Sequence, residues 1–328
     1  MNAQIKKLNE QAVEYSGNIN EVMIEVKKTI VGQNDLIEKI MIALIADGHV
    51  LVEGVPGLAK TLTIRTISDT LKADFVRLQF TPDLLPSDIL GTKIFNQKES
   101  TFKTKKGPIF SNFVLADEIN RAPPKVQSAL LEAMQERQVT IQGETFPLVR
   151  PFLVLATQNP IETEGTYKLP EAQVDRFMFK LLVSYPNKLE EKTIIQRFTQ
   201  GATIKTNKIL DLKQIADIQS FCQQVYADEK IEEYVTDLVD ATRHPEHYKL
   251  DVDSFIEYGA SPRASIWLIL AAKANALLNQ RGFVIPEDVK TVCHDVLRHR
   301  IMLTYEGEAE GIRSDDIIDK LLSKIKAP

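Results

Sequence analysis

Eight consecutive residues carry the pattern of a phosphate-binding loop. Residues 54–61 read GVPGLAKT, which matches G-x-x-x-x-G-K-[ST] except that Ala59 stands where the second glycine is expected. In such a loop, backbone N–H groups and the following helix hold phosphate oxygens, Lys60 reaches the β- and γ-phosphates, and Thr61 offers a hydroxyl to Mg²⁺. We expect the loop to tolerate alanine if Ala59 keeps a right-handed backbone. The alternative is a glycine-containing turn with an incidental lysine.

Two adjacent acids follow a separate apolar run. Residues 113–116 read FVLA and end in Asp117 and Glu118. Ligands of α/β proteins bind at the carboxyl ends of buried strands, where these side chains would lie. We expect Asp117 to hold Mg²⁺, directly or through water, and Glu118 to orient and polarise an attacking water molecule. A pair of solvated acids in a turn is the alternative.

A polar side chain follows the next apolar run. Residues 152–156 end in the sequence TQNP, which contains Asn159. At the end of a neighbouring strand, Asn159 would lie beside the acidic pair and hydrogen-bond a γ-phosphate or the attacking water. Asparagine before proline is also a common start of a turn, so the pattern leaves both interpretations open.

The elements that must position these residues alternate along the chain. Five runs are continuously apolar, as in strands that a parallel sheet buries on both faces: residues 49–53, 75–80, 113–116, 152–156 and 177–183. With helical segments between them, they predict an α/β fold with a parallel five-stranded sheet. Residues 92–106 and 138–149 read as hairpins. The lysines of the first hairpin, at positions 98, 103, 105 and 106, are solvated or contact an acidic partner or nucleic acid.

Helical patterns flank this region. Residues 1–29 predict one helix or two, with a break near residues 16–18, and residues 188–328 show helical periodicity with almost no strand signal. We therefore divide the chain into a helical segment (1–29), an α/β nucleotide-binding core with two hairpin inserts (30–187) and a smaller all-helical lid domain (188–328).

Composition narrows the class of protein. The 328 residues are 44% hydrophobic and 26% charged with a net charge of −5, so nucleic acid is not expected as a partner. The only two cysteines, Cys222 and Cys293, indicate a reducing compartment. No signal-peptide pattern and no uncharged stretch long enough to cross a bilayer occur, so we expect a cytoplasmic protein without membrane insertion.

The histidines predict no further site. His244 and His247 are three residues apart, but Pro245 interrupts any helix that would align them, and no third histidine or cysteine is near in sequence. We therefore do not expect a metal site there.

Together these features resemble the MoxR family of AAA+ ATPases, whose fold is a P-loop α/β sandwich with a helical lid. The resemblance covers nearly the whole chain, and the alanine at position 59 looks like the family's own version of the loop. Six segments carry it: residues 53–61 (EGVPGLAKT), 79–88 (QFTPDLLPSD), 116–125 (ADEINRAPPK), 156–160 (ATQNP), 169–177 (LPEAQVDRF) and 261–264 (SPRA).

The resemblance implies roles that spacing alone does not give. Asn159 looks like the sensor-1 residue, Arg176 like an arginine finger that reaches the nucleotide of a neighbouring subunit, and Arg263 like the sensor-2 arginine that contacts the γ-phosphate of its own subunit. An ion pair with the adjacent Asp175 is the alternative for Arg176. The two hairpins look like the helix-2 and pre-sensor-1 inserts of this branch. The expected contacts to ATP are Val31, Gly32, Gly54, Val55, Pro56, Gly57, Leu58, Ala59, Lys60, Thr61 and Leu62.

The resemblance also implies a biological role. Proteins of this family form hexameric rings and couple ATP hydrolysis to the remodelling or maturation of client proteins, including proteins with von Willebrand factor A domains, or to metal-cofactor insertion. A chelatase-like motor subunit is close to this reading. The rivals are a nucleic-acid motor of the same branch, which the acidic composition disfavours, and a scaffold that binds ATP without hydrolysing it, which the complete set of site residues disfavours.

Overall fold

The central element is a parallel sheet of five strands. The computed structural model describes residues 3–55, 57–160, 165–199 and 205–328. The strands lie in the order β2-β5-β8-β1-β9, and each neighbouring pair is parallel. Their bounds are β1 (Val50–Glu53), β2 (Phe75–Gln79), β5 (Phe113–Asp117), β8 (Leu153–Gln158) and β9 (Phe179–Leu182). The predicted five-stranded parallel sheet is confirmed.

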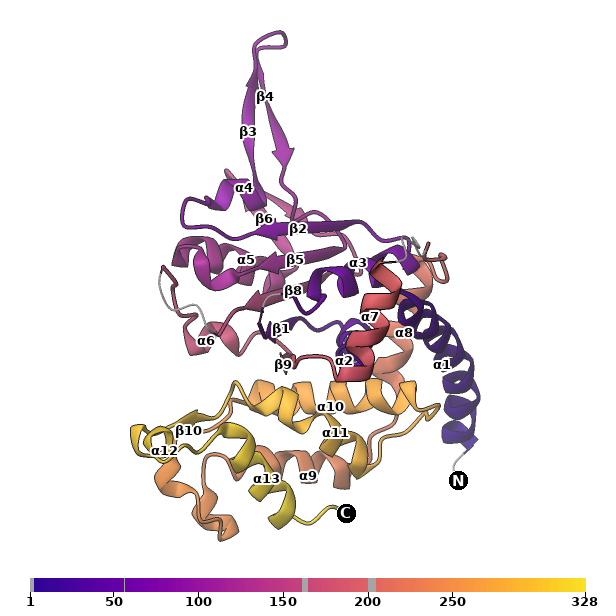
Figure 1. Cartoon of the computed structure of the whole chain (residues 1–328), viewed down its shortest axis with the longest axis vertical. Helices are drawn as coiled ribbons and strands as arrows, with labels where there is room; N and C mark the ends of the chain where they lie inside the picture. Colours follow the sequence, from indigo (N-terminus) through magenta and orange to yellow (C-terminus); the bar gives the residue numbers. More distant parts are fainter. Residues whose placement is uncertain (1–2, 56, 161–164, 200–204) are drawn as a thin grey trace.

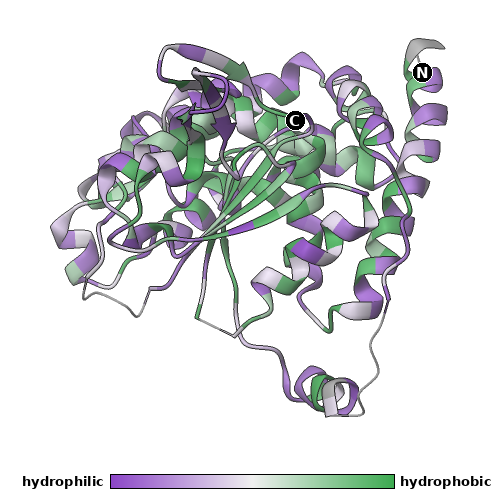
Figure 2. Ribbon diagram, turned by 90° about the horizontal axis from the view of Figure 1, so that it is seen from above, coloured by the Kyte–Doolittle hydropathy of each residue, from purple (hydrophilic) through white to green (hydrophobic). Residues whose placement is uncertain are grey.

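The sheet separates two hydrophobic cores. Leu115 and Leu153 belong to the core shared with the amino-terminal helices and the lid, whereas Val114 and Val154 belong to the core on the other side. Alternate residues of each strand thus serve opposite faces, which explains why the central strands are continuously apolar in sequence. Figure 2 shows these strands as hydrophobic ribbons surrounded by helices with hydrophilic outer faces.

Helices cover the sheet and build the lower half of the molecule (Figure 1). The α-helices are α1 (Ala3–Thr29), α2 (Asn34–Ile45), α3 (Lys60–Thr70), α4 (Pro86–Leu90), α5 (Pro124–Glu136), α6 (Glu171–Val174), α7 (Lys188–Thr199), α8 (Leu212–Gln224), α9 (Glu229–Asp240), α10 (Pro262–Leu278), α11 (Pro286–Leu297), α12 (Tyr305–Ala309) and α13 (Ser314–Lys324). Three short 3₁₀ helices are η1 (Ile119–Arg121), η2 (Pro245–Tyr248) and η3 (Asp253–Phe255).

The amino-terminal segment is a single helix, so the break considered near residues 16–18 does not occur. A glycine inside a helix costs about 1 kcal/mol, but packing outweighs this cost. Val22 and Val26 are fully buried, and the Ser16 hydroxyl donates a 2.9 Å hydrogen bond to the Leu278 carbonyl oxygen of α10. Helix α1 therefore joins the nucleotide-binding half to the lid.

Both predicted hairpins are present. Strands β3 (Gly91–Asn96) and β4 (Thr101–Lys106) form the first, and β6 (Gln138–Ile141) and β7 (Glu144–Pro147) form the second. Figure 1 shows that β3 and β4 project well beyond the rest of the molecule.

The lid contains one element that the sequence did not predict. Strands β10 (Ile256–Tyr258) and β11 (Met302–Leu303) pair antiparallel within the otherwise helical half. Strands of three and two residues are too short to show a period of two in sequence. Helix α10 begins at Pro262, and the Ser261 hydroxyl caps it by accepting a hydrogen bond from the Arg263 N–H.

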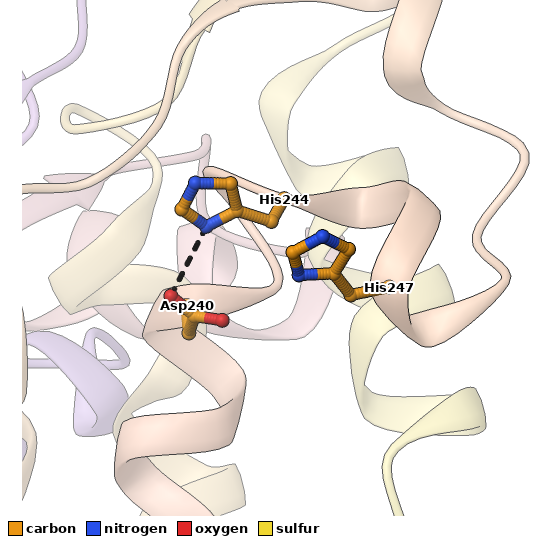
Figure 3. Close-up of side chains that lie close together, drawn as sticks. All are labelled: Asp240, His244 and His247. Carbon is orange, nitrogen blue, oxygen red and sulfur yellow. Dashed lines mark hydrogen bonds and ion pairs between the residues drawn. The ribbon is translucent and has the colours of Figure 1, made fainter.

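The turn after α9 also differs from expectation. Helix α9 ends at Asp240, and Pro245 opens the 3₁₀ turn η2, which folds His247 back beside His244. The two imidazole rings stack with centroids 5.2 Å apart (Figure 3). The two histidines thus come together without a shared α-helix, which the sequence did not predict.

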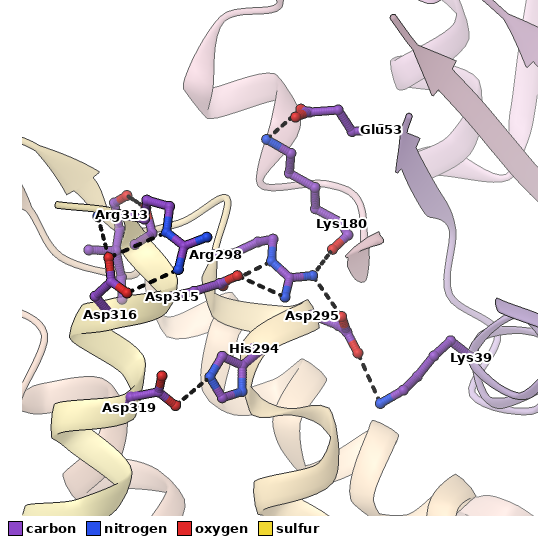
Figure 4. Close-up of polar contacts among 12 residues, drawn as sticks. Lys39, Glu53, Lys180, His294, Asp295, Arg298, Arg313, Asp315, Asp316 and Asp319 are labelled. Atoms are coloured by element: carbon purple, nitrogen blue, oxygen red, sulfur yellow. Dashed lines mark hydrogen bonds and ion pairs between the residues drawn. The ribbon is translucent and has the colours of Figure 1, made fainter. Parts of the chain in front are cut away.

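Charged side chains fasten the lid to the sheet (Figure 4). Lys39 of α2, only 4% exposed, forms a 2.9 Å ion pair with Asp295 of α11. Arg298 pairs with Asp295 at 2.7 Å and donates to the Lys180 carbonyl oxygen of β9, also at 2.7 Å. Lys180 in turn pairs with Glu53 of β1 at 2.8 Å. Ion pairs of this kind, partly removed from water, fix the orientation of α11 against β9.

Cys222 and Cys293 are free and buried, and burial raises the pKa of each thiol to about 12. None of the helices among the described residues combines the length and the apolar character that a membrane span requires.

Candidate nucleotide site

The phosphate loop connects β1 to α3, as the sequence predicts. A Cβ atom at Gly54 would lie 2.9 Å from the Val183 carbonyl oxygen, so only glycine lets the end of β9 pass this close. Gly57 has a φ of +86°, a conformation that favours glycine. Val55 is half-buried beside Gly54, and the predicted contact Pro56 lies outside the described residues.

Ala59 departs from the expected backbone. Its φ of 55° and ψ of 18° are left-handed, whereas the sequence analysis required a right-handed conformation. A left-handed alanine costs about 1–2 kcal/mol. The conformation is explained by the turn into α3: Ala59 is the residue before the helix, and its carbonyl oxygen accepts a 2.8 Å hydrogen bond from the Thr63 N–H. Left-handed residues are also part of the backbone concavities that bind anions.

Lys60 points back into the loop. Its Nζ donates a 2.7 Å hydrogen bond to the Gly54 carbonyl oxygen. Burial lowers the pKa of the Lys60 ammonium, while the nearby carboxylates of Asp117 and Glu118 raise it. The cation is thus held at the loop with the acidic pair opposite.

Thr157 fixes the acidic pair from the neighbouring strand. Its hydroxyl donates to Asp117 Oδ1 at 2.6 Å and accepts from the Glu118 N–H at 2.9 Å. Glu118 has a left-handed φ of 57°. Strained backbone conformations of non-glycine residues cluster at functional sites.

The edge strand β2 adds two residues that the sequence analysis missed. Arg77 donates to Asp117 Oδ2 from Nη2 at 2.6 Å and from Nε at 3.0 Å. Gln79 Nε2 donates to Glu118 Oε2 at 2.8 Å. Residues two apart on a strand face the same side, and Gln79 lies opposite Asp117 in the register. Arg77 and Gln79 are two residues apart in the sequence, but their contacts with the acidic pair can be inferred only when β2 is known to neighbour β5.

These groups surround one cavity of about 380 Å³. It is lined by an ammonium, a guanidinium, two hydroxyls, two carboxylates and two amides, and Asn159 is 7% exposed there. Its lining includes the predicted residues Gly57, Leu58, Ala59, Lys60, Thr61, Leu62, Asp117, Glu118 and Asn159, together with Arg77, Thr157 and Gln158.

Val31 and Gly32, two of the expected contacts to ATP, lie next to a second cavity. This cavity of about 290 Å³ is lined by Gln33, Leu36, Val183 and neighbouring residues, and it reaches the phosphate loop through the contact of Val183 with Gly54. Gly32 has a φ of +69°, and a Cβ atom there would lie 2.7 Å from Glu190 of α7. Val31 and Gly32 precede the lining residues without being among them.

The two predicted arginines lie elsewhere. Arg176 and Arg263 both line a third cavity of about 410 Å³, with Asp47 and His49 at the amino end of β1. Because β1 and β9 are parallel, this is the edge of the sheet opposite the phosphate loop. Arg263 does not line the cavity that contains Lys60, so its position does not support the expected contact with the γ-phosphate of its own subunit.

The partners of the two arginines differ. Arg263 pairs with Asp175 at 3.3 Å and donates to Gln135 at 3.3 Å. Asp175 also pairs with the buried Arg300 at 2.8 Å, and burial lowers the pKa of Arg300 to about 10. The ion pairs of Asp175 among the described residues are thus with Arg263 and Arg300, not with Arg176 as the alternative proposed. The Nε of Arg176 is buried without a hydrogen-bond partner.

Comparison with known proteins identifies the family. Residues 49–179 match the ATPase family associated with various cellular activities (AAA), and residues 249–321 match the AAA lid domain. Over 312 residues the chain is 49% identical to Chaperone MoxR1 of Mycobacterium tuberculosis, covering 94% of this chain and 82% of that protein. The chain belongs to the MoxR family of AAA+ ATPases.

Two further relatives agree with this assignment to the MoxR family. Protein MoxR of Methylorubrum extorquens is 30% identical over 325 residues, which is 93% of each protein. The crystal structure of a candidate ATPase from Cytophaga hutchinsonii superposes with a TM-score of 0.93 and 50% identity over the whole of both chains. The P-loop sandwich with a lid is therefore the fold of this chain.

Proposed function

We propose that this protein binds and hydrolyses ATP in the cavity between the phosphate loop and the acidic pair. The observation that carries the proposal is the meeting of Lys60, Thr61, Asp117, Glu118 and Asn159 around one cavity of about 380 Å³. Phosphoryl transfer asks a protein mainly for positioning and charge stabilisation, and these groups supply both.

Each group has a distinct task. The backbone N–H groups of the loop and the ammonium of Lys60 hold the phosphates. Glu118 orients the attacking water, and its carboxylate is held toward the cavity by Gln79. Asn159 donates or accepts a hydrogen bond at the γ-phosphate or the water.

Thr61 and Asp117 are the residues that would hold Mg²⁺. They fit this ion, because a hydroxyl and a carboxylate are oxygen ligands, and both line the same cavity. Asp117 already accepts two hydrogen bonds from the Arg77 guanidinium, so this carboxylate is placed to face a cation. When bound, the ion neutralises charge on the transferring phosphoryl group.

We further infer that Arg176 and Arg263 act on the nucleotide of a neighbouring subunit. Both guanidinium groups face a cavity at the amino edge of the sheet, where their own chain has no phosphate loop. A ring, in this family a hexamer, would place this edge against the neighbour's carboxyl edge. This proposal replaces the role that was predicted for Arg263 in its own subunit with a role at the nucleotide of the next subunit.

The energy of hydrolysis serves the remodelling of client proteins in this proposal, as the name of the chaperone relative suggests. The β3–β4 hairpin suits client contact, because it projects from the body and exposes Phe95 (49%) and Phe102 (68%) as a pair with ring centroids 5.2 Å apart. Clients with von Willebrand factor A domains, metal-cofactor insertion and a cytoplasmic location are proposals that rest on the family alone.

The hairpin lysines do not favour the nucleic-acid motor. Lys93 pairs with Glu144 at 3.1 Å, and Lys103 pairs with Glu99 at 2.5 Å. Lys106 lies over the Phe110 ring at 4.7 Å. These cations are already engaged within the hairpins and their base. An increase of the hydrolysis rate on adding DNA would nevertheless favour the motor.

The test compares phosphate release by the wild type and Glu118→Gln, with nucleotide binding followed in parallel by a fluorescent ATP analogue. We expect the variant to bind ATP and hydrolyse it at least 100-fold more slowly, on the order of a general-base loss. Equal, negligible rates in both proteins would instead identify a non-hydrolysing scaffold.

A second experiment addresses the clients. Glu118→Gln saturated with ATP should retain client proteins that Phe102→Ser in the same background releases. Tyr305→Ser is the matched control, because Tyr305 of the lid is an equally accessible aromatic side chain (88% exposed). Recovery of nothing but further copies of this chain would contradict the client proposal.

A further inference from the structure

Two histidines and an aspartate meet on the exposed surface of the lid, at the turn from α9 to η2. One ligand atom from each of Asp240, His244 and His247 lies within 4.8 Å of the others. Figure 3 shows the two rings side by side, with His244 directed at Asp240. His244 Nδ1 and Asp240 Oδ1 are 3.2 Å apart. This group is far in sequence from the nucleotide site and plays no part in it.

A tyrosine holds the aspartate in place. The Tyr248 hydroxyl lies 3.2 Å from Asp240 Oδ2 and 3.3 Å from Asp237 Oδ1. The O–H of Tyr248 is placed to donate to either carboxylate. Asp240 Oδ1 is left to face His244. An outer hydrogen bond that orients a carboxylate in this way is a regular feature of metal sites.

Three carboxylates lie near the two imidazoles. Asp237, Asp240 and Glu246 contribute three carboxylates, and His247 Nε2 lies 3.5 Å from Glu246 Oε1. Two imidazoles with a carboxylate are the donor set of Zn²⁺ and related transition metals, whereas Mg²⁺ prefers oxygen ligands alone. These donor atoms therefore favour Zn²⁺ and related transition metals over Mg²⁺.

The other histidines of the chain provide a contrast. His49 is buried, with its Nε2 at the Met134 carbonyl oxygen and its Nδ1 accepting from the Val154 N–H. His299 directs Nε2 to the Phe177 carbonyl oxygen. His294 pairs with one carboxylate, that of Asp319, at 3.0 Å. Within the described part of the chain, the α9–η2 turn is where two imidazoles and a carboxylate converge.

The two stacked rings must rotate before their nitrogens can close around an ion. Zn–N bonds of about 2.0–2.1 Å place tetrahedral ligand atoms roughly 3.3 Å apart. The side chains of His244 and His247 are 49% and 66% exposed, so rotation about their own bonds can shorten the present separation without moving the backbone.

We propose that Asp240, His244 and His247 form a binding site for a divalent transition cation of the Zn²⁺ class. Water completes the coordination, and the ion ties the end of α9 to η2. The turn is itself hydrogen-bonded to the segment before α10, through Thr242 Oγ1 and the Ala260 N–H at 2.8 Å. A bound ion therefore stiffens the lid near the helix that carries Arg263.

The test uses the full-length, chelator-treated protein in a buffer with excess Mg²⁺, which occupies oxygen-only sites. We expect calorimetry with Zn²⁺ to show one site per chain, and Co²⁺ to give a visible absorption band from the same site. His244→Gln and His247→Gln should each weaken Zn²⁺ binding at least tenfold, while His294→Gln, a histidine with a single carboxylate partner, should bind as the wild type does.

Thermal unfolding supplies a second readout that does not depend on ATP hydrolysis. Zn²⁺ should raise the unfolding midpoint of the wild type and of His294→Gln but not that of His247→Gln, because a ligand of the folded state stabilises it. Equal Zn²⁺ affinity in the wild type and His247→Gln, or an equal loss in His294→Gln, would overturn the proposal and leave the nucleotide site untouched.

Discussion

The two edges of the central sheet differ in the charges that they gather. At the carboxyl edge, Lys60 faces two carboxylates, and each carboxylate is already hydrogen-bonded by β2 or β8. At the amino edge, guanidinium groups predominate, and Arg176 and Arg263 line a cavity without a phosphate loop. One edge thus holds the groups that bind a triphosphate and direct water, and the other holds cations suited to stabilise developing charge. Under the proposed function, a complete site therefore requires two subunits.

Substitution of Arg176, at the amino edge, should have the largest effect on ATP hydrolysis. Arg176→Ala should lower the hydrolysis rate by roughly 10³–10⁵-fold, the contribution of an arginine finger in other NTPases, with ATP affinity changed only slightly. Phosphate release and binding of a fluorescent nucleotide measure the two effects. Arg313→Ala is the control, because Arg313 is 76% exposed in the lid and pairs only locally with Asp316. Tenfold weaker ATP binding by the isolated subunit would mean that Arg176 serves its own nucleotide.

Substitution of the neighbouring residue, Asp175, should mainly lower the stability of the fold. Asp175→Asn removes the charge that compensates Arg300, whose side chain is 1% exposed, so we expect about 3 kcal/mol less stability to unfolding. A denaturation curve tests this. Asp316→Asn breaks an exposed pair instead and should cost at most about 1 kcal/mol. Equal unfolding midpoints for Asp175→Asn and Asp316→Asn would show that Asp175 does not stabilise the fold by compensating Arg300.

At the carboxyl edge, Arg77 should compete with a metal ion for Asp117. Arg77 is half-exposed, so its ion pair is worth up to about 1 kcal/mol. Arg77→Gln should therefore lower the Mg²⁺ concentration for half-maximal ATP binding by roughly two- to fivefold. A Mg²⁺ titration of nucleotide fluorescence measures the shift. A higher Mg²⁺ requirement would mean that Arg77 helps to hold the ion's ligand in place.

The smallest expected effect lies in the loop itself. Ala59→Gly relieves a left-handed alanine, worth about 1–2 kcal/mol, but adds the entropic cost of glycine, about 0.5–1 kcal/mol. We expect a gain of roughly 0.5 kcal/mol in the free energy of unfolding, with ATP binding retained. Loss of stability in a denaturation curve would show that the left-handed conformation at residue 59 carries no strain.

The predictions from sequence were most accurate for features formed by residues that are close together in the chain. The phosphate loop and the acidic pair each follow a strand directly, so local pattern was enough to place Lys60 and Glu118. Arg77 was missed because its contact with Asp117 depends on strand order. The position of Arg263 away from the phosphate loop was not predicted because it depends on how the lid docks through Asp175. His244 and His247 were dismissed because the 3₁₀ turn that reunites them has no periodic signal.

Packing explains the other departures. Burial of α1 against α3 and α10 outweighs the turn signals near Gly17. Ala59 adopts a strained conformation because the loop must turn into α3. Local preference decides a backbone only where tertiary contacts do not outweigh it.

The most direct test of a site shared between subunits mixes two inactive variants. Arg176→Ala keeps its own Lys60 and Glu118, and Glu118→Gln keeps its own Arg176, so an interface between them contains one complete site. Each variant alone should be nearly inactive. Mixed assemblies, confirmed by native mass spectrometry, should recover ATP hydrolysis with a maximum at intermediate ratios. No recovery at any ratio, in assemblies shown to contain both variants and to bind ATP, would contradict the account.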